Sequence, residues 1–346
     1  MDHYRRSARN WFAGHPIDRI PDRRQDGRWV AERLQDPNTR LIPVWNGKNL
    51  FAKGPVPQPV LLAPQDMGGL IAQAESIVLL GEAEGRVYFA VGLHTGDGSP
   101  PPEMAELGEF RNLRWIGAGS ERETVALLAY AKAMTYWHHR QRFCADCGSP
   151  TESADGGHLR VCTNPQCGQQ HFPRTNPAII VLVTSGERCL LGRQATWPKG
   201  LYATIAGFVE PGESLEDAVV REVMEETGVR VREVTYHSSQ PWPFPSSIML
   251  GFTAEAASKE IALSDGELED ARWFSREEIW SGVKGEWLRM PLRASISYRL
   301  IEDWFDGEGS PRLEDLCTIR PPGPTQAGGG RPRGGTARAG PPGGRG

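Results

Sequence analysis

Three carboxylates are grouped in one short segment of the chain. Glu222 and Glu226 are one helical turn apart and Glu225 lies beside them, so a helix would bring all three toward one point. Such a cluster is repulsive unless it is neutralised, and Mg²⁺ or Mn²⁺, which favour oxygen ligands, would relieve the repulsion while binding a phosphate. The alternative is a solvated acidic helix face. Arg221 within the cluster and the glycine-containing turn before it argue against that alternative.

Carboxylates that hold cations against a phosphate suit hydrolysis at that phosphate. A phosphate is anionic, so water approaches it slowly until metal ions withdraw charge from its oxygens, orient the water and lower the pKa of that water. A carboxylate can then accept the proton. Glu225 and Glu226 are both candidates for this base, and the two duties can be shared.

Two close pairs of cysteines predict a structural metal site. Two residues separate Cys144 from Cys147, four separate Cys162 from Cys167, and 14 lie between the pairs. Four thiolates saturate a tetrahedral Zn²⁺ ion and leave no position open for chemistry, so we expect one structural zinc per chain. The other two cysteines, Cys189 and Cys317, are read as small apolar side chains or surface thiols.

The elements that must position these groups can be read from the hydrophobic pattern. A helix is expected over residues 213–227, because Pro211 and Gly212 precede it, apolar residues follow at helical spacing, and Gly228 suits its C-cap. Further helices are expected from residue 121 to residue 140 and over 295–304. Strands are expected at 76–80, 87–91, 178–183, 188–192 and around 248–254, with a hairpin joining 178–183 to 188–192.

The segment from Gly207 to Val229 matches the Nudix box, G-x5-E-x7-R-E-U-x-E-E-x-G-U with U aliphatic, at every specified position. The chain therefore resembles the Nudix hydrolases. The resemblance implies an α+β protein with the Nudix fold, a mixed sheet between helices, which hydrolyses a nucleoside diphosphate linked to another group. Carried over residue by residue, it implies the metal ligands Glu222, Glu225, Glu226 and the main-chain carbonyl of Ala206, with Arg221 orienting a neighbouring glutamate.

A second motif, SQPWPFPSS at 239–247, follows ten residues after the box. By itself it suggests a stiff, extended loop, because three prolines alternate with Trp242 and Phe244. After a zinc ribbon and a Nudix box, however, it resembles the signature of the NADH pyrophosphatase branch. That resemblance implies cleavage of NAD(H) to nicotinamide mononucleotide and AMP. The alternative that it leaves open is removal of 5′ NAD caps from RNA by the same site.

The same resemblance implies a composite substrate site in a homodimer. Phe208 would stack on the nicotinamide, and Phe172 would come from the partner subunit to complete the sandwich. Glu267 resembles a further metal-binding glutamate, with Glu269 close enough to remain an alternative. Ser246 departs from the family, in which many members have Gln. The remaining implied substrate-binding residues are Gln240, Pro241, Trp242, Pro243, Phe244, Pro245, Ser246, Ser247 and Ser297.

The length of 346 residues fits several domains, and we expect four segments. These are a small mixed α/β N-terminal domain at 1–138, which the family resemblance implies to be NADH-pyrophosphatase-like, a zinc ribbon at 139–172, a Nudix hydrolase domain at 173–317 and a tail at 318–346. The N-terminal domain carries no chemical motif that we can assign. The last 26 residues hold ten Gly, six Pro and four Arg, so we expect them to be disordered and to bear a charge of +4.

The net charge of −4 gives no overall attraction to nucleic acid or acidic membranes. No apolar run is long enough to cross a membrane and no signal peptide precedes the domains, so a cytoplasmic protein is expected. An interaction protein built on an inactive Nudix domain is a competing hypothesis. The intact Glu222, Glu225 and Glu226 argue against it.

Overall fold

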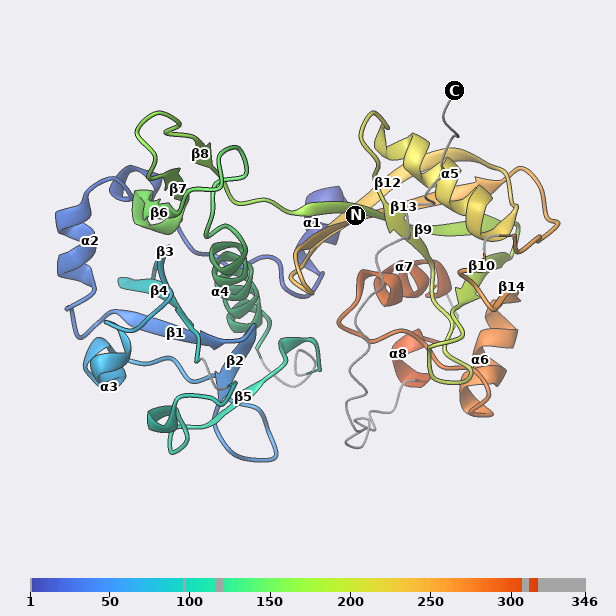
Figure 1. Ribbon diagram of the computed structural model, residues 1–346. Helices are drawn as coiled ribbons and strands as arrows, with labels where there is room; N and C mark the ends of the chain where they lie inside the picture. Colours follow the sequence, from blue (N-terminus) through green and yellow to red (C-terminus); the bar gives the residue numbers. More distant parts are fainter. Residues whose placement is uncertain (1, 96–97, 116–120, 265, 307–310, 317–346) are drawn as a thin grey trace, which may run out of the picture.

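The computed structural model describes residues 2–95, 98–115, 121–264, 266–306 and 311–316, and it has two lobes (Figure 1). One lobe holds the N-terminal sheet and the cysteine segment, and the other holds the segment with the carboxylate helix. We predicted that Cys317 is a small apolar side chain or a surface thiol, and that the tail at 318–346 is disordered. Both lie outside the described residues. Within the described part of the chain, no helix is both long and apolar enough to cross a membrane.

The N-terminal lobe is built on a five-stranded sheet in the order β3-β4-β1-β2-β5. Alternating residues of β1 and β3 face opposite sides: Ile42 and Val78 pack under helix α4, whereas Leu41 and Leu79 face the shorter helices. The elements are α1 His3–Ala8, α2 Gly27–Arg33, β1 Arg40–Trp45, β2 Lys48–Phe51, α3 Pro64–Met67, β3 Ser76–Ala83, β4 Arg86–Leu93, β5 Glu109–Arg111 and α4 Arg122–Arg140.

The cysteine segment forms a three-stranded antiparallel sheet of β6 Thr151–Ala154, β7 Leu159–Cys162 and β8 Gln170–His171. Gly148 and Gly168, each directly after a cysteine pair, have φ values of 74° and 56°, a conformation that glycine adopts without strain. Two histidines join the cysteine segment by hydrogen bonds to helix α4 and strand β3 of the same lobe. His138 Nε2 donates to Gly157 O at 2.8 Å, and His158 Nε2 donates to Leu79 O at 2.7 Å.

The second lobe is a mixed sheet between helices, as expected for the α+β Nudix fold. Its strand order is β12-β13-β9-β10-β14, with β11 also paired to β9; β13 and β9 run parallel. Helix α5 covers one face, and α6, α7 and α8 cover the other. The elements are β9 Asn176–Ser185, β10 Arg188–Arg193, β11 Ile205–Phe208, α5 Leu215–Thr227, β12 Val231–Trp242, β13 Ser247–Ala256, β14 Asp270–Ser275, α6 Arg276–Lys284, α7 Ile296–Phe305 and α8 Leu313–Leu316.

Two local predictions need correction. Helix α5 begins at Leu215 rather than at residue 213, because the Ser214 hydroxyl accepts a hydrogen bond from the Asp217 N–H and caps the helix. The 239–247 segment is not an extended loop, since its first four residues complete β12 and Ser247 begins β13. Pro241 is tolerated in β12 because this is the edge strand of the sheet and pairs only with β13.

The N-terminal residues cross from their own lobe to the second one. Helix α1 packs against β12 (Figure 1). Asn10 Nδ2 donates to Ser239 O at 2.9 Å, and Arg9 forms an ion pair with Asp303 at 3.0 Å. The first residues of the chain therefore contact and support the end of β12, the strand that carries the proline-rich motif.

Candidate active site

Helix α5 carries Glu226 on the same buried face as Val219 and Val223. Val219 and Val223 are fully buried against the sheet, and Gly228 ends the helix with a φ of 69°. Among the three glutamates, Glu226 is buried with 3% exposure, Glu222 is largely buried, and Glu225 has 54% of its side chain exposed. The acidic face is therefore only partly solvated, in contrast to an ordinary charged helix surface.

Arg221 connects the carboxylates of the helix to one another. Its Nη1 donates to Glu222 at 2.9 Å and to Glu225 at 3.0 Å. Its Nε and Nη2 donate to the two oxygens of Glu213 at 2.5 and 2.9 Å, and Nη2 also donates to Phe208 O at 2.9 Å. This bidentate pair lowers the pKa of Glu213 to about 2 and raises the pKa of Arg221. The guanidinium thus fixes the spacing of the acidic groups.

Glu222 reaches across from the helix to strand β11. A Cβ atom on Gly207 would lie 1.9 Å from the Glu222 carboxyl carbon, so only glycine leaves room for this side chain. Gly207 pairs with Ile179 of β9 and directly follows Ala206, whose carbonyl the family resemblance assigns as a metal ligand. The close approach of the Glu222 carboxylate to β11 therefore requires the glycine at the start of the Nudix box.

The electrostatics of Glu222 favour a bound cation. Burial raises the pKa of Glu222, Arg221 partly offsets this, and the carboxylates of Glu225 and Glu267 raise it further. A divalent cation would compensate both the burial and the like charges, and the donors are all oxygens, as hard cations prefer. The described residues therefore fit a Mg²⁺- or Mn²⁺-type ion.

Glu267 and Glu269 have different surroundings. Glu269 forms an ion pair with Arg193, and its N–H donates to Arg193 O at 2.9 Å. Glu267 instead accepts a hydrogen bond from Gln194 Nε2 at 3.3 Å and is near enough to Glu222 to affect the pKa of that residue. Of the two alternatives, Glu267 is the better placed to join the carboxylates of α5.

Phe208 and Phe172 are both unusually exposed for phenylalanines, at 59% and 58%. Phe208 ends β11, and its main-chain carbonyl accepts a hydrogen bond from Arg221, so the backbone of Phe208 adjoins the carboxylate cluster. Phe172 follows β8 in the other lobe. Neither ring forms an aromatic pair with another ring of the part of the chain that the structure describes, and both rings are exposed to solvent.

The proline-rich motif is mostly committed to the protein's own packing. Gln240 is buried; its Nε2 donates to Trp11 O and Ala294 O, and its Oε1 accepts from the Ile296 N–H at the start of α7. Trp242 and Phe244 form an edge-to-face pair, 5.0 Å between centroids, and both rings contact Phe12. The remaining members, Pro241, Pro243, Pro245, Ser246 and Ser247, lie along β12, the connecting turn and the start of β13.

Ser297 is buried in the first turn of α7 and contacts Thr204 directly before β11. The Thr204 N–H donates to Ser297 Oγ at 3.1 Å, and the two hydroxyls are 2.8 Å apart. Thr204 was not singled out in the sequence, because a lone threonine outside a motif gives no signal. The contact fixes the α7 terminus beside the strand that carries Ala206 and Gly207.

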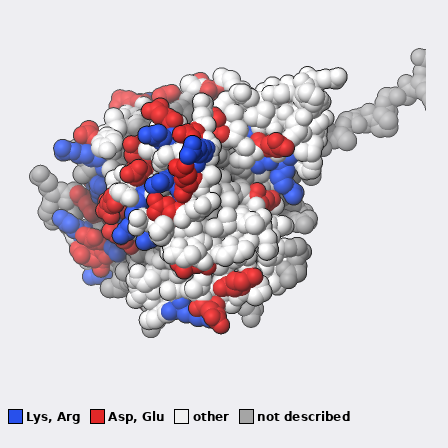
Figure 2. All heavy atoms as spheres, turned by 90° about the vertical axis from the view of Figure 1, so that its left-hand side faces the viewer, with Lys and Arg blue, Asp and Glu red and all other residues white. Residues whose placement is uncertain are grey.

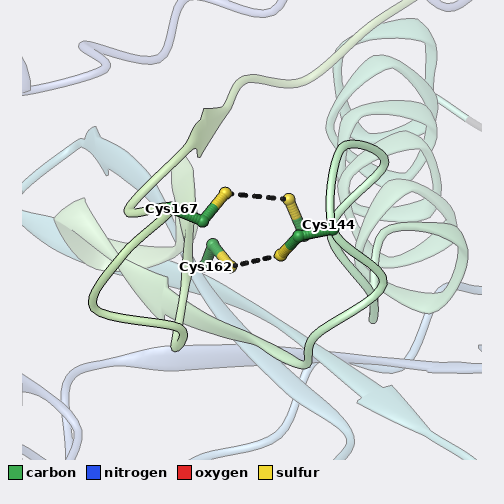
Figure 3. Close-up of side chains that lie close together, drawn as sticks. Cys144, Cys162 and Cys167 are labelled. Carbon is green, nitrogen blue, oxygen red and sulfur yellow. Dashed lines mark hydrogen bonds between the residues drawn. The ribbon is translucent and has the colours of Figure 1, made fainter.

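The four predicted cysteines meet in the other lobe (Figure 3). Cys144 and Cys167 are 3.8 Å apart at sulfur, Cys147 and Cys162 are 3.4 Å apart, and all four sulfurs lie within 4.8 Å of one another. Tetrahedral zinc with bonds of about 2.3 Å requires sulfur–sulfur separations of about 3.8 Å. The quartet therefore fits a structural zinc ion. Cys189 is buried within β10, as expected for a small apolar residue.

Three family models match consecutive parts of the chain. A NUDIX domain matches residues 174–293, an NADH pyrophosphatase zinc ribbon domain 139–172, and an NADH pyrophosphatase-like rudimentary NUDIX domain 38–137. The chain is also 33% identical over 339 residues to a Macaca fascicularis protein named NAD-capped RNA hydrolase NUDT12, covering 86% of this chain and 73% of that protein. The chain belongs to the NADH pyrophosphatase family of Nudix hydrolases. This Nudix hydrolase is also 38% identical over 257 residues to NAD-capped RNA hydrolase NudC of Mycobacterium bovis, covering 64% of this chain and 81% of the relative.

Membership of the Nudix hydrolases makes the chain an enzyme that uses divalent cations, and the ribbon is a zinc-binding module. The predicted fold class and family are thereby confirmed. The N-terminal lobe, in which the sequence offered no motif, matches a rudimentary NUDIX domain. No acidic helix marks that domain in the sequence, so its expected NADH-pyrophosphatase-like character rested on its position and size alone.

Proposed function

We propose that this Nudix hydrolase cleaves the pyrophosphate of NAD(H) to give nicotinamide mononucleotide and AMP. The proposal rests mainly on one observation: the Glu222 carboxylate is held beside Gly207 by Arg221, and the next residue of β11 is the exposed Phe208. A phosphate-binding metal centre and an exposed aromatic side chain then lie at the same end of one strand. That combination suits a dinucleotide with an aromatic base beside its phosphates.

In this proposal the carboxylates of Glu222, Glu225, Glu226 and Glu267, with the Ala206 carbonyl, hold the catalytic cations, either Mg²⁺ or Mn²⁺. The cations supply charge neutralisation on the pyrophosphate oxygens and a lower pKa for the attacking water. Arg221 keeps Glu222 and Glu225 at a fixed separation. Glu225 and Glu226 share the duties of ligand and general base, and the more exposed Glu225 is the one open to solvent water.

The contacts of the proline-rich motif support a positioning role for part of it. Gln240 ties β12 to the start of α7, and Ser297 on that helix ties it to Thr204. We propose that these residues set the shape of the substrate site, whereas Phe208 and the Ser246 region contact the dinucleotide itself. The exposure of Phe172 in the other lobe supports a homodimer in which Phe172 of one subunit covers the nicotinamide bound at the other.

A second candidate substrate is RNA with a 5′ NAD cap. Relatives whose names specify this activity favour it, and the same metal site would cleave the same bond. Figure 2 shows acidic and basic side chains intermixed on the face of the N-terminal lobe, rather than a basic stripe. RNA contacts on this face would therefore add little affinity, and recognition would depend on the cap.

Product analysis by mass spectrometry tests the proposal. Purified full-length protein is incubated with NADH and with NAD-capped RNA, side by side at equal metal and salt concentrations. We expect reduced nicotinamide mononucleotide and AMP in equal amounts from NADH, and nicotinamide mononucleotide with 5′-monophosphate RNA from the capped transcript. Release of free nicotinamide with ADP-ribose would show cleavage of the glycosidic bond instead and would contradict the proposal.

A further inference from the structure

A second group of metal-ligating side chains lies in the N-terminal lobe, away from both the ribbon and the carboxylate helix. Glu75, His94 and His139 each offer a ligand atom within 4.8 Å of the others. The β3–β4 ladder brings the first two together, because Ser76 pairs with Gly92 and the Glu75 N–H donates to Gly92 O at 2.9 Å. His139 comes from the last turn of α4, which packs on these strands.

Two of these side chains already lie at nearly the separation that two ligands of one metal ion have. His139 Nδ1 lies 2.9 and 3.1 Å from the two oxygens of Glu75. A tetrahedral ion bound to nitrogen and oxygen at about 2.0–2.1 Å separates them by about 3.3 Å, so a small adjustment would admit it. The His94 ring is 5.4 Å from the His139 ring, centroid to centroid.

His94 is already oriented by a neighbour. Its Nδ1 lies 3.2 Å from Asn46 Oδ1, a contact in which the ring donates to the amide oxygen. Such a contact fixes the tautomer that leaves Nε2 with a lone pair, which is how outer partners orient histidine ligands in metal sites. The group thus combines three ligands with an orienting residue.

A cavity of about 340 Å³ adjoins the group and is lined by all three side chains. Its volume exceeds that of a single ion and leaves room for water or a small ligand to complete the coordination. Pro245 of the proline-rich motif lines the same cavity, as does Lys132. The Nζ of Lys132 is turned to Gly47 O, to which it donates at 2.5 Å, and burial lowers the pKa of Lys132 to about 8, so its charge decreases above that pH.

We propose that Glu75, His94 and His139 bind a divalent transition-type cation such as Zn²⁺, separate from the ribbon zinc and from the catalytic cations. Two imidazoles and one carboxylate favour zinc and its neighbours over Mg²⁺, which prefers oxygen ligands alone. Because Pro245 borders the cavity, the bound cation would lie against the turn of the proline-rich motif. The proposal does not depend on the identity of the dinucleotide substrate.

Zinc stoichiometry measured on the full-length protein tests this site. The protein is equilibrated with Zn²⁺ in excess Mg²⁺, which occupies the catalytic carboxylates, and bound zinc is counted by atomic spectroscopy. We expect two zinc ions per chain in the unmodified protein and one in Glu75→Gln and in His94→Asn. The exposed His94 is chosen because its replacement leaves the core intact. With Co²⁺ as the probe, the second ion should absorb without the thiolate charge-transfer bands of the ribbon.

Glu84→Gln is the matched control, since Glu84 is an exposed carboxylate at the opposite end of the same β3–β4 hairpin. It should retain both zinc ions and an unchanged affinity, whereas the His94 variant should lose at least about tenfold in affinity for the second ion. A single zinc in the unmodified protein, or a second zinc that survives both ligand variants, would overturn the proposal. Phosphate binding in the cavity without a second zinc would also overturn it and assign the cavity to an anion.

Discussion

At the scale of single residues, the candidate active site depends on how one arginine divides its donors. Arg221 binds Glu213 with two donors and shares a third between Glu222 and Glu225. The two-donor pair is planar and directional, so it restrains the guanidinium more than a lysine ammonium would. The acidic side chains are thereby held in place before any cation arrives.

Gly207→Ala should separate activity from stability. The added Cβ would occupy the place of the Glu222 carboxylate, and this flexible side chain would have to rotate away from β11. Gly207 does not have a positive φ, so the backbone tolerates alanine, and the free energy of unfolding should change by less than about 1 kcal/mol. We expect kcat to fall about 100-fold. Unchanged turnover in steady-state assays would contradict the role given to this close approach.

Glu213→Gln should show a stability defect that depends on pH. Arg221 lowers the pKa of Glu213 from its ordinary value of 4.5 to about 2. The folded protein thus binds this proton more weakly than the unfolded chain, so the stabilisation is present above pH 4.5 and is lost as pH falls toward 2. In paired urea unfolding experiments, the variant should be less stable than the unmodified protein near neutral pH, and the difference should shrink in acid. A difference that does not vary with pH would refute this.

The residue types and spacings of the candidate site could be predicted from the sequence. Which of these side chains form hydrogen bonds within the protein could not be predicted. Glu222, Glu225 and Arg221 could be assigned because helical spacing alone brings them together. Gln240 and Ser297 could only be called substrate-binding residues, since their partners, Ala294 and Thr204, are distant in the sequence. Tertiary contacts of this kind have no local signal.

At the scale of elements, the ribbon should depend on its metal. Cys144→Ser removes one of four ligands, and we expect it to lose the ribbon zinc and to lower the midpoint of thermal unfolding. Because His138 and His158 attach the ribbon to the N-terminal lobe, that lobe should be destabilised with it. Asp146→Asn, an exposed change between the two cysteines of the pair, is the control and should keep its zinc. A Cys144→Ser protein with full zinc content would contradict the assignment.

Most elements could be located from the sequence because their patterns are local. The β9–β10 hairpin and helices α4, α5 and α7 lie within two residues of the expected ends. The proline-rich motif was misread because proline normally interrupts strands. Because β12 is an edge strand, no second neighbouring strand requires the N–H that Pro241 lacks. Whether a strand lies at an edge depends on the whole sheet, so the segment alone does not show it.

At the scale of the whole molecule, Phe12 connects the two lobes. Its buried ring contacts Trp242 and Phe244 at centroid distances of 5.7 and 5.4 Å. Phe12→Ala should destabilise the protein by about 3–5 kcal/mol and reduce activity, because the motif loses its support. Tyr4→Ala, at a residue that is 83% exposed, should change neither property. Equal unfolding curves for both variants in denaturant titrations would contradict this account of the interface.

How the lobes fit together could not be predicted from the sequence. The expected boundaries at 138/139 and 172/173 stay predictions, and the structure adds that α1 leaves its own lobe to contact β12. The same N-terminal segment also reaches α7, where Arg9 forms an ion pair with Asp303, almost 300 residues away in the chain. No periodicity or spacing connects residues at that distance.

The central claim is that the carboxylates of α5 hold the cations that hydrolyse a dinucleotide pyrophosphate. Glu226→Gln tests it most directly, with Glu216→Gln, an exposed residue of the same helix, as the control. In an NADH hydrolysis assay with saturating Mg²⁺ or Mn²⁺, we predict that kcat falls about 100-fold or more for Glu226→Gln and is unchanged for Glu216→Gln, with both proteins folded by circular dichroism. Full turnover by a folded Glu226→Gln protein would contradict the account.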